Sequence, residues 1–416
     1  MNSSVRSGRP VQRRGRVVSL TVRGGTTLVV AVVAFLLAYL LDWPELLIVA
    51  CFCGIPPLLA LVFVVRMRPR ITVTRFVSPA IISAGSTGSA SVRLNTRGGS
   101  RTVFARWRDY LPWSPGSTRI ESLPTPGVGG SSTLQYAFAP PRRGIVELGP
   151  LVIEVADPFG LARGEFSVGG LQRVVVAPET ALLPTGAVDI ASDSGSARLF
   201  QHRALVGEHD IMTRDYRPGD AIRRVHWRAS AHHGDLMVRE DEKRSHAEAL
   251  IVVDTRRGSY RDVSRNSSPE IPESEFFEWA LRMVASLRDH LTRSGLRVRV
   301  VESAVPQLAD ADHGDDFVES LARIRLSYQD GPAIRLAEAR PDSVGSVFAI
   351  LNDPDDETVT ALVEQRGSFD LAIAFLLGEA RSEFASTLQR VGWIVHRVTP
   401  GETVAEAWFA IGAPDD

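Results

Sequence analysis

Residues 249–254, Ala-Leu-Ile-Val-Val-Asp, decide the fold of the C-terminal part of the chain. The run is continuously apolar and ends in an acid, which is typical of a strand that is buried on both faces of a parallel sheet. A helix is predicted over residues 275–293, because Ser274 can cap its start and Gly295 follows its end. Further predicted strands at 296–301, 346–351, 369–376 and 393–398 alternate with predicted helices near 315–325, 355–366, 380–391 and 403–410. This alternation predicts a doubly wound α/β domain over residues 245–416.

The densest local pattern lies immediately upstream, in a segment of arginines and aromatic residues. Pro218-Gly219 has the composition of a turn, and Asp220 can cap a helix that runs to Gly234. A rigid turn would result if Arg214 or Arg223 paired with Asp220. The motif therefore suits positioning rather than chemistry, either by binding a partner or by joining two domains. Its candidate residues are Arg214, Tyr216, Pro218, Gly219, Asp220, Arg223, His226 and Trp227, within a linker and motif region over residues 186–244.

Histidines and arginines in this region leave two other functions open. Six of the nine histidines lie between residues 202 and 246, which suggests a metal site. However, His-Glu-x-x-His is absent, and the adjacent His232 and His233 would diverge on a helix. Arginines interleaved with Tyr216 and Trp227 could hold phosphates and stack on bases. Acidic residues dilute the positive field there, so a protein partner is favoured over nucleic acid.

A change of periodicity marks a β-rich segment over residues 70–185. Residues 71–76 and 90–94 alternate apolar and polar side chains, as half-buried strands do. Further strands are predicted at 102–107, 132–138, 145–155 and 173–176, with clusters of Gly, Pro and Ser between them. Short strands at this spacing predict a small β-sandwich-like module with a structural or binding role.

Two apolar runs near the N-terminus predict a pair of transmembrane helices over residues 26–65. The runs at 26–41 and 46–65 are long enough, at about 1.5 Å per residue, to cross the core of a bilayer. The preceding tail, residues 1–25, contains arginines and no acid, and three arginines follow the second run directly. Because positive flanks stay in the cytoplasm, both ends of the hairpin are expected there. A cleaved signal peptide is the alternative, but no small-x-small cleavage site follows the first run.

The overall composition excludes several classes of protein. The chain has 416 residues, 44% of them apolar, and a formal net charge of −1, which argues against a disordered chain or a polycationic nucleic-acid binder. Its two cysteines, Cys51 and Cys53, lie in the second apolar run and are too few for a disulfide framework or a four-cysteine zinc site. The sole lysine, Lys243, is not part of a Walker A sequence, so a P-loop nucleotidase is excluded.

The spacing of the central motif resembles that of a known family. The pattern is Arg214-x-Tyr216-x-Pro218-Gly219-Asp220-x-x-Arg223-x-x-His226-Trp227, which is similar to the hallmark of the bacterial domain-of-unknown-function 58 family. A second signature of that family resembles Arg143-Gly144-x-x-x-Leu148-Gly149-Pro150, followed by Asp157-Pro158-Phe159-Gly160-Leu161. The resemblance implies an N-terminal membrane hairpin, a β-rich segment and a C-terminal domain similar to von Willebrand factor type A domains.

The type A resemblance implies a magnesium site, which this sequence has lost in part. In that family, an Asp-x-Ser-x-Ser sequence follows the first strand, but here Arg256 and Gly258 occupy the serine positions after Asp254. A guanidinium close to Asp254 would supply the positive charge itself and exclude a divalent cation. Asp353, at the end of another strand, could stand in for a later aspartate of that site, but two carboxylates do not make an octahedral site. No metal or other cofactor is therefore expected.

Together these features predict a non-enzymatic scaffold or adaptor in the bacterial inner membrane, multi-pass, with both termini in the cytoplasm. The hairpin would contact the lipid bilayer, and the cytoplasmic domains would bind protein partners and no nucleic acid. The family resemblance implies cooperation with a MoxR-type AAA+ ATPase and a transglutaminase-like membrane protein in envelope assembly or maturation. The alternative is a metal-dependent hydrolase that uses Asp254, Asp353 and histidines from residues 202–246.

Overall fold

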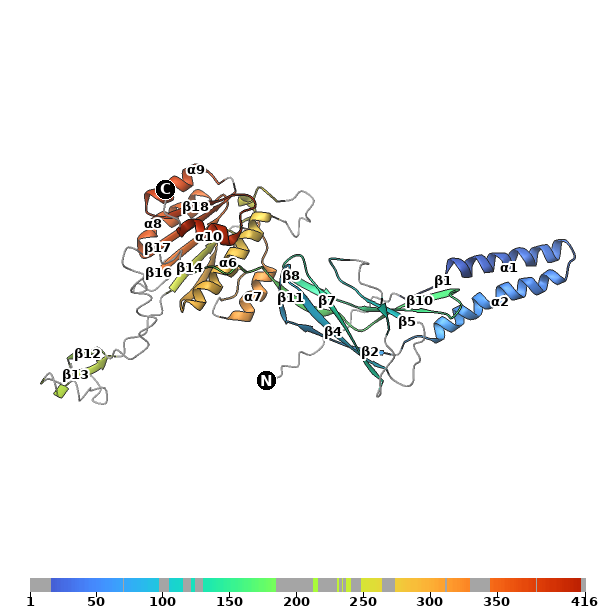
Figure 1. The fold of residues 1–416 in the computed structure, drawn as a ribbon. Coiled ribbons are helices and arrows are strands. Elements are labelled where there is room, and N and C mark those ends of the chain that lie inside the picture. The colour runs from blue at the N-terminus through green and yellow to red at the C-terminus, as the bar shows by residue number, and fades with distance from the viewer. Residues whose placement is uncertain are drawn as a thin grey trace. The chain divides into compact units, whose positions relative to one another are not determined.

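The computed structural model of the chain divides into two units, Met1–Ala177 and Pro178–Asp416 (Figure 1). The structure describes residues 16–69, 71–96, 105–114, 121–123, 130–184, 212–215, 230–231, 234, 237–240, 248–263, 274–310, 313–329, 345–378 and 380–412. Each unit has a hydrophobic core of its own, so each is described by itself.

A helical hairpin opens the first unit, formed by α1 (Val22–Leu40) and α2 (Glu45–Arg66) (Figure 1). Small side chains are buried where the helices meet, including Ala34 and Ala38 of α1 and Ala50 of α2, while most of the valines, leucines and phenylalanines are exposed. Soluble proteins rarely expose so large an apolar surface. Both helices are long and apolar enough to cross a membrane, and the described part of the chain contains no third helix of this kind.

The end of the basic tail belongs to the fold, contrary to the prediction that residues 1–25 form a separate tail. Arg16–Leu20 is strand β1, which pairs antiparallel with β10 (Ala162–Val168). Val18 and Leu20 pack against the core of the first unit, which explains why an arginine-rich segment contributes a strand. Thr21 alone separates β1 from the start of α1.

The predicted β-rich segment is confirmed and forms three sheets. Its other strands are β2 (Ile71–Ser78), β3 (Ile81–Ser83), β4 (Gly88–Thr96), β5 (Ala105–Asp109), β6 (Glu121–Ser122), β7 (Ser131–Phe138), β8 (Gly144–Leu148), β9 (Leu151–Ala156) and β11 (Gln172–Ala177). The strand orders are β1-β10-β9-β5-β6, β2-β4-β7 and β3-β11-β8. Side chains of β4 and β7 share one core with those of β5, β9 and β10, so two of the sheets pack face to face as in a sandwich.

The strands differ from the prediction at several places, and the short strands β3 and β6 have no counterpart in it. The single strand expected at 145–155 is two strands, β8 and β9, which a turn at Gly149-Pro150 separates. Strand β10 also has no counterpart in the prediction. Its sequence Ala-Arg-Gly-Glu-Phe-Ser-Val does alternate non-polar and polar residues, but the first two non-polar positions are alanine and glycine, which are depleted in strands.

A buried ion pair joins two strands of this unit. Arg75 of β2 donates hydrogen bonds to both carboxylate oxygens of Asp109 in β5, at 3.1 and 2.8 Å, and their side chains are 3% and 0% exposed. The Tyr136 hydroxyl donates to Asp109 at 2.5 Å. Burial and the Asp109 carboxylate raise the pKa of Tyr136, so its hydroxyl remains a donor at physiological pH. Both charges of the ion pair are therefore satisfied inside the fold.

The first part of the second family-like signature surrounds this ion pair. The carbonyl oxygen of Leu148 accepts a hydrogen bond from Arg75 at 3.3 Å. Gly149 has a φ of +96°, and a Cβ atom at this position would lie 2.7 Å from a guanidinium nitrogen of Arg75. Glycine is therefore required both by its backbone conformation and by the close approach of the arginine. This gives a physical reason for the glycine in Leu148-Gly149-Pro150.

The second unit contains the predicted doubly wound α/β domain, and its predicted elements are confirmed. They are β14 (Glu248–Val253), α6 (Glu275–Arg293), β15 (Arg297–Glu302), α7 (Gly314–Arg323), β16 (Gly345–Leu351), α8 (Asp356–Glu364), β17 (Phe369–Leu377), α9 (Ser382–Arg390), β18 (Ile394–Val398) and α10 (Val404–Gly412). The strands form one parallel sheet in the order β15-β14-β16-β17-β18. Side chains of α6, α7 and α10 pack on one face of the sheet, and those of α8 and α9 pack on the other.

The boundary between the units lies earlier than the prediction, which placed the end of the β-rich segment at residue 185. The division falls after Ala177, and the following residues belong to the α/β domain. The backbone N–H of Ala181 donates to the Ser286 hydroxyl at 2.9 Å, and Leu183 is buried in the core of the second unit. Trp408 of α10 donates its indole N–H to the carbonyl oxygen of Pro184 at 2.9 Å. These contacts attach residues 178–184 to α6 and α10.

A buried histidine predicts a pH dependence of this domain. Burial lowers the pKa of His290. A hydrogen bond with the backbone of Leu183 raises this pKa, but the effect of burial is larger. The unfolded chain, with an ordinary histidine pKa of about 6.5, therefore binds a proton more readily than the folded chain, so the free energy of unfolding falls as the pH drops below that value. We expect His290→Gln to flatten this decline in thermal melts between about pH 7.5 and pH 5. Equal slopes for the variant and the wild type would show that another group causes the decline.

Candidate functional site

The strand order of the α/β sheet reverses between β14 and β16, because the chain goes from β14 to β15 on one side and then returns to the other. Ligands of such sheets bind at this reversal, beyond the carboxyl ends of the strands. Asp254 follows β14, and Asn352 and Asp353 follow β16, so both predicted aspartates lie at this edge. The edge is therefore the candidate functional site.

Asp254 is completely buried and lies against a guanidinium. Its Oδ1 accepts hydrogen bonds from Nε of Arg256 at 3.3 Å and from the Ser303 hydroxyl at 2.6 Å. The contact predicted from the Asp-x-Arg spacing is thus present. The Tyr260 hydroxyl donates to the backbone carbonyl oxygen of Asp254 at 2.7 Å, and burial raises the pKa of Tyr260 well above its ordinary value. This hydrogen bond fixes the loop that follows β14.

Arg256 also binds a second carboxylate, that of Asp355 at the start of α8. Asp355 caps this helix, because its side chain accepts a hydrogen bond from the Thr358 backbone N–H at 2.8 Å. Burial alone would lower the pKa of Arg256, but the carboxylates of Asp254 and Asp355 raise it above the ordinary value. Partial burial would raise the pKa of Asp355, but hydrogen bonds from Thr358 and the charge of Arg256 hold it below the ordinary value. Arg256 and Asp355 therefore stay charged at physiological pH.

A second cluster of charges forms the rim of the site. Asp353 pairs with Arg261 at 2.8 Å and with Arg381 at 3.3 Å. Arg381 immediately precedes α9, donates to the carbonyl oxygen of Pro354 at 3.2 Å, and lies 4.0 Å from the centre of the Phe384 ring. Asp254 and Asp353 are thus each held by arginines.

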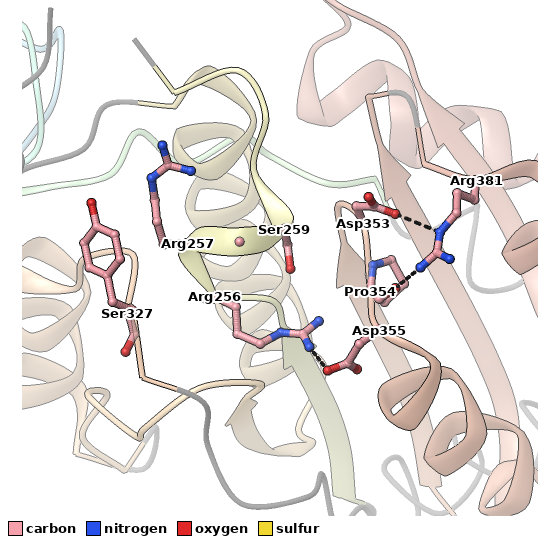
Figure 2. A pocket seen from close by; sticks show the side chains of 10 residues that line it. Arg256, Arg257, Ser259, Ser327, Asp353, Pro354, Asp355 and Arg381 are labelled. Carbon is pink, nitrogen blue, oxygen red and sulfur yellow. Dashed lines mark hydrogen bonds and ion pairs between the residues drawn. The ribbon is translucent and has the colours of Figure 1, made fainter. Parts of the chain in front are cut away.

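These groups line a pocket of about 520 Å³ (Figure 2). Its lining comprises Arg256, Arg257, Gly258, Ser259, Ser327, Tyr328, Asp353, Pro354, Asp355 and Arg381. Figure 2 shows Arg256 directed toward Asp355 and Arg381 directed toward Asp353. The lining contains three arginines and two aspartates, and Tyr328 is 71% exposed. The pocket lining therefore contains one more arginine than aspartate, together with an accessible aromatic ring.

The residues present do not fit the magnesium site of a von Willebrand type A domain. The Arg256 guanidinium bridges Asp254 and Asp355, the position that a shared cation would need, and its charge repels a divalent cation. Within the ranges that the structure describes, no group of three His, Cys, Asp or Glu side chains could hold a metal ion. The histidines between residues 202 and 246 lie outside those ranges.

Most of the central motif falls outside the described residues. Of its candidate residues only the backbone of Arg214 is described, in β12 (Met212–Asp215), which pairs antiparallel with β13 (Met237–Glu240). The strand predicted at 235–239 corresponds to β13. The structure does not describe Tyr216, Pro218, Gly219, Asp220, Arg223, His226 or Trp227.

The rest of the second signature, Asp157, Pro158, Phe159 and Gly160, lies in the first unit and forms the turn between β9 and β10. The carboxylate of Asp157 accepts hydrogen bonds from the backbone N–H groups of Phe159 at 2.9 Å and Ala162 at 2.5 Å. The Asp157 side chain therefore has a structural role, because it stabilises a tight turn through these backbone hydrogen bonds.

Four residues that complete the site at the sheet edge are absent from the prediction. They are Arg261, Ser303, Asp355 and Arg381. Asp355 carries a signal in the sequence, because an aspartate at the start of a predicted helix is a preferred cap. The other three come from separate loops, and only the folded sheet brings them together.

Comparisons with known proteins identify one family and distant structural similarities. The model described as "Protein of unknown function DUF58" matches residues 212–275, and no curated protein matches the sequence. The CARDB domain of a Pyrococcus furiosus protein is 16% identical over 24% of this chain and 94% of its own, with a TM-score of 0.17. A cycloisomaltooligosaccharide glucanotransferase of Paenibacillus sp. is 11% identical over 78% of this chain and 53% of its own, with a TM-score of 0.18. TM-scores this low support no argument about fold or function.

The match to the family model spans the central motif and the start of the α/β domain. It begins at β12, includes β13 and β14, and extends past the paired Asp254 and Arg256 to the start of α6. The same residues carry the long motif from Arg214 to Trp227, whose spacing already resembles this family. Residues 212–275 therefore match the DUF58 family, as the spacing of the central motif predicts.

Proposed function

We propose that the chain is a non-enzymatic adaptor that binds protein partners at the carboxyl edge of its α/β sheet. The pairing of Arg256 with both Asp254 and Asp355 carries this proposal. A carboxylate that acts as a general base accepts a proton, and one in a metal site binds the cation; a carboxylate already paired with a buried guanidinium is poorly suited to either task. The edge instead offers a pocket with fixed charges, which suits recognition. In this proposal the domain is a relative of von Willebrand type A domains in which an arginine replaces the cation.

We further propose that the hairpin anchors this adaptor in the bacterial inner membrane, with both ends of the chain in the cytoplasm. The length and exposed apolar surface of α1 and α2 support this location. Arg23, Arg66 and Arg68 lie at the same end of the hairpin and are exposed, whereas the connection between the helices contains Asp42 and Glu45. This asymmetry agrees with a cytoplasmic location of the arginine-rich end.

The charge of the pocket indicates what a partner would present to it. Its excess of arginine and the exposed Tyr328 favour an acidic segment with an apolar or aromatic side chain. A MoxR-type AAA+ ATPase and a transglutaminase-like membrane protein are the partners we propose, in envelope assembly or maturation. The identities of these two partners rest on the family resemblance. The pocket supports only the kind of segment that a partner would present, which is acidic with an apolar or aromatic side chain.

The rival hydrolase would require Asp254 and Asp353 to work with a bound metal. Arg256 holds the first aspartate, while Arg261 and Arg381 hold the second. Neither carboxylate is therefore prepared to bind a cation, which favours the adaptor. Metal analysis of the purified full chain separates the two functions, since a hydrolase of this type would contain a stoichiometric metal ion.

Charge reversal at the rim tests the adaptor. We expect Arg381→Glu to weaken binding of a purified MoxR-type ATPase from the same bacterium by about tenfold or more, because it replaces a favourable charge with a repulsive one. Binding would be measured with the full chain in lipid nanodiscs. Arg390→Glu makes the same change of charge at an exposed position in the last turn of α9 and should leave the affinity unchanged.

The result has two informative failures. If both variants bind the ATPase as well as the wild type does, the partner contacts another surface. If neither the wild type nor the Arg381→Glu and Arg390→Glu variants bind the ATPase, it is not a direct partner. A photocrosslinking amino acid at the exposed Tyr328 position would then identify by mass spectrometry what occupies the pocket in native membranes.

A further inference from the structure

The turn between β9 and β10 lies against the start of the first hairpin helix. The backbone N–H of Thr21 donates to the carbonyl oxygen of Leu161 at 2.8 Å, and the Thr21 hydroxyl donates to that of Gly160 at 2.6 Å. The same hydroxyl accepts a hydrogen bond from the Gly24 N–H at 3.2 Å and so caps α1. One residue therefore starts the helix and holds the turn.

The packing at this point is too close for an ordinary side chain on the helix. A Cβ atom on Gly24 would lie 2.0 Å from the carbonyl oxygen of Leu161. The turn thus touches the backbone of the first helical turn directly. The β9–β10 turn therefore lies at a fixed position along the axis of α1, beside the first turn of this helix.

The other helix of the hairpin is joined to the same strands. Ala60 and Val64, in the last turns of α2, are buried in one core with Ala162 and Phe166 of β10. Both connections are short, since α1 begins two residues after β1 and β2 begins at Ile71, soon after α2 ends at Arg66. The β sheets therefore continue from the hairpin without a flexible spacer.

This geometry sets the depth of the turn if the hairpin spans the bilayer, which is part of the proposed function. The 19 residues of α1 rise about 28 Å, close to the thickness of a hydrocarbon core, so its first turn lies at the cytoplasmic boundary. The β9–β10 turn is at the same level. Phe159, at the tip of that turn, is 77% exposed, and its neighbour Pro158 is exposed as well.

We propose that the Asp157–Gly160 turn docks on the cytoplasmic leaflet, with the Phe159 ring inserted between the headgroups and the acyl chains. A phenyl ring gains free energy when its apolar surface leaves water for this boundary. The exposed arginines 23, 66, 68 and 163 would lie near anionic headgroups. The occupant of this surface is thus an anionic phospholipid bilayer, and Asp157 shapes the turn that presents Phe159 to it.

Depth-dependent quenching tests the proposal with the full chain in vesicles of phosphatidylcholine and phosphatidylglycerol. The chain contains two cysteines, so Phe159→Cys in a background of Cys51→Ala and Cys53→Ala carries one fluorescent label. We expect lipids with a quencher near the headgroup to quench this label strongly, and water-soluble iodide to quench it weakly. The substitution should not disturb the fold, because the side chain it replaces is exposed.

The matched control is a label in the loop at the other end of the β2 and β4 strands, at Ser86→Cys. Eight paired residues of β2 separate this loop from the end of the hairpin, which corresponds to roughly 26 Å. Iodide should quench this label strongly and lipid-borne quenchers weakly. A label at position 159 that behaves like the one at Ser86 would refute the docking of the turn.

A third label separates this proposal from the insertion of the hairpin. With Cys53→Ala alone, the natural Cys51 of α2 reports whether the hairpin is in the bilayer. Deep quenching at Cys51 without quenching at position 159 refutes only the docking of the turn. No lipid quenching at Cys51 refutes the membrane anchor itself. Protection of position 159 from both lipid and aqueous quenchers would mean that protein, and not lipid, covers the turn.

Discussion

Replacing Asp109 with alanine should lower the free energy of unfolding of the first unit by about 3–5 kcal/mol, because it leaves the buried Arg75 without its counter-charge. The side chain of Arg75 is 3% exposed, so water cannot replace the lost carboxylate. Tyr136 and the backbone N–H of Tyr110 would lose their acceptor at the same time. An unpaired buried donor adds to the cost of an unpaired buried charge.

Hydrogen exchange measured by mass spectrometry can follow this effect in one unit of the chain. Amides of β4 and β7 lie in the core of the first unit, and we expect them to exchange much faster in Asp109→Ala, while those of β14 and β16 should be unchanged. A whole-chain melting temperature is less informative, since two units need not unfold together.

Two further variants show whether the buried charge is the cause. Arg108→Ala removes a neighbour on the same strand whose ion pair with Glu165 is partly exposed, with side-chain exposures of 36% and 40%, so it should cost less than about 1 kcal/mol. The double variant Arg75→Met with Asp109→Leu removes both charges and should recover most of the stability. A double variant as unstable as Asp109→Ala would mean that packing, and not charge, is responsible.

Replacing Arg256 with serine should destabilise the α/β domain by about 3–5 kcal/mol, since Asp254 has no exposure to water and would lose its counter-charge. The same change should also create affinity for a divalent cation. Asp254 and Asp355 would remain, with hydroxyl oxygens nearby, and oxygen ligands are those that magnesium and calcium prefer. Millimolar magnesium or calcium should therefore stabilise the variant but not the wild type.

The adjacent arginine provides the matched control. Arg257 donates to the carbonyl oxygen of Tyr260 at 2.9 Å, away from the two carboxylates that Arg256 bridges. Arg257→Ser should therefore have a smaller effect on stability and should not respond to divalent cations. Hydrogen exchange of the β14 and β16 amides in the full chain, with and without cation, measures both effects within the α/β domain. Stabilisation of the wild type by magnesium would contradict the idea that Arg256 replaces the cation.

The α/β domain could be predicted from the sequence because its strands are buried on both faces. Continuous apolar runs such as 249–254 and 369–376 stand out against the amphipathic helices between them. Sheets with one exposed face give weaker patterns, and β10 mixes arginine, glutamate and glycine with its apolar residues. β1 was not predicted for another reason. Its partner strand β10 is remote in sequence, and the arginines around β1 suggest a solvated tail.

The candidate site could be predicted only where its residues are neighbours in sequence. The spacing of Asp254 and Arg256 is enough to predict their contact, because both belong to one short loop. Ser303 and Arg381 reach the same edge from loops after β15 and before α9, and their positions in the sequence carry no sign of this. The Arg75–Asp109 pair is similar, since an arginine in a strand normally indicates a face exposed to water.

The pairing of β1 with β10 has a consequence for the biogenesis of the protein. A ribosome makes Arg16–Leu20 first, then the hairpin, and makes Ala162–Val168 only much later. In the proposed topology the hairpin enters the membrane before β10 has been synthesised, so the edge of β1 is still unpaired at that stage. Such edges invite aggregation and capture by chaperones. A nascent chain that stalls before residue 162 would therefore remain in the membrane with an unprotected edge, which marks it for quality control.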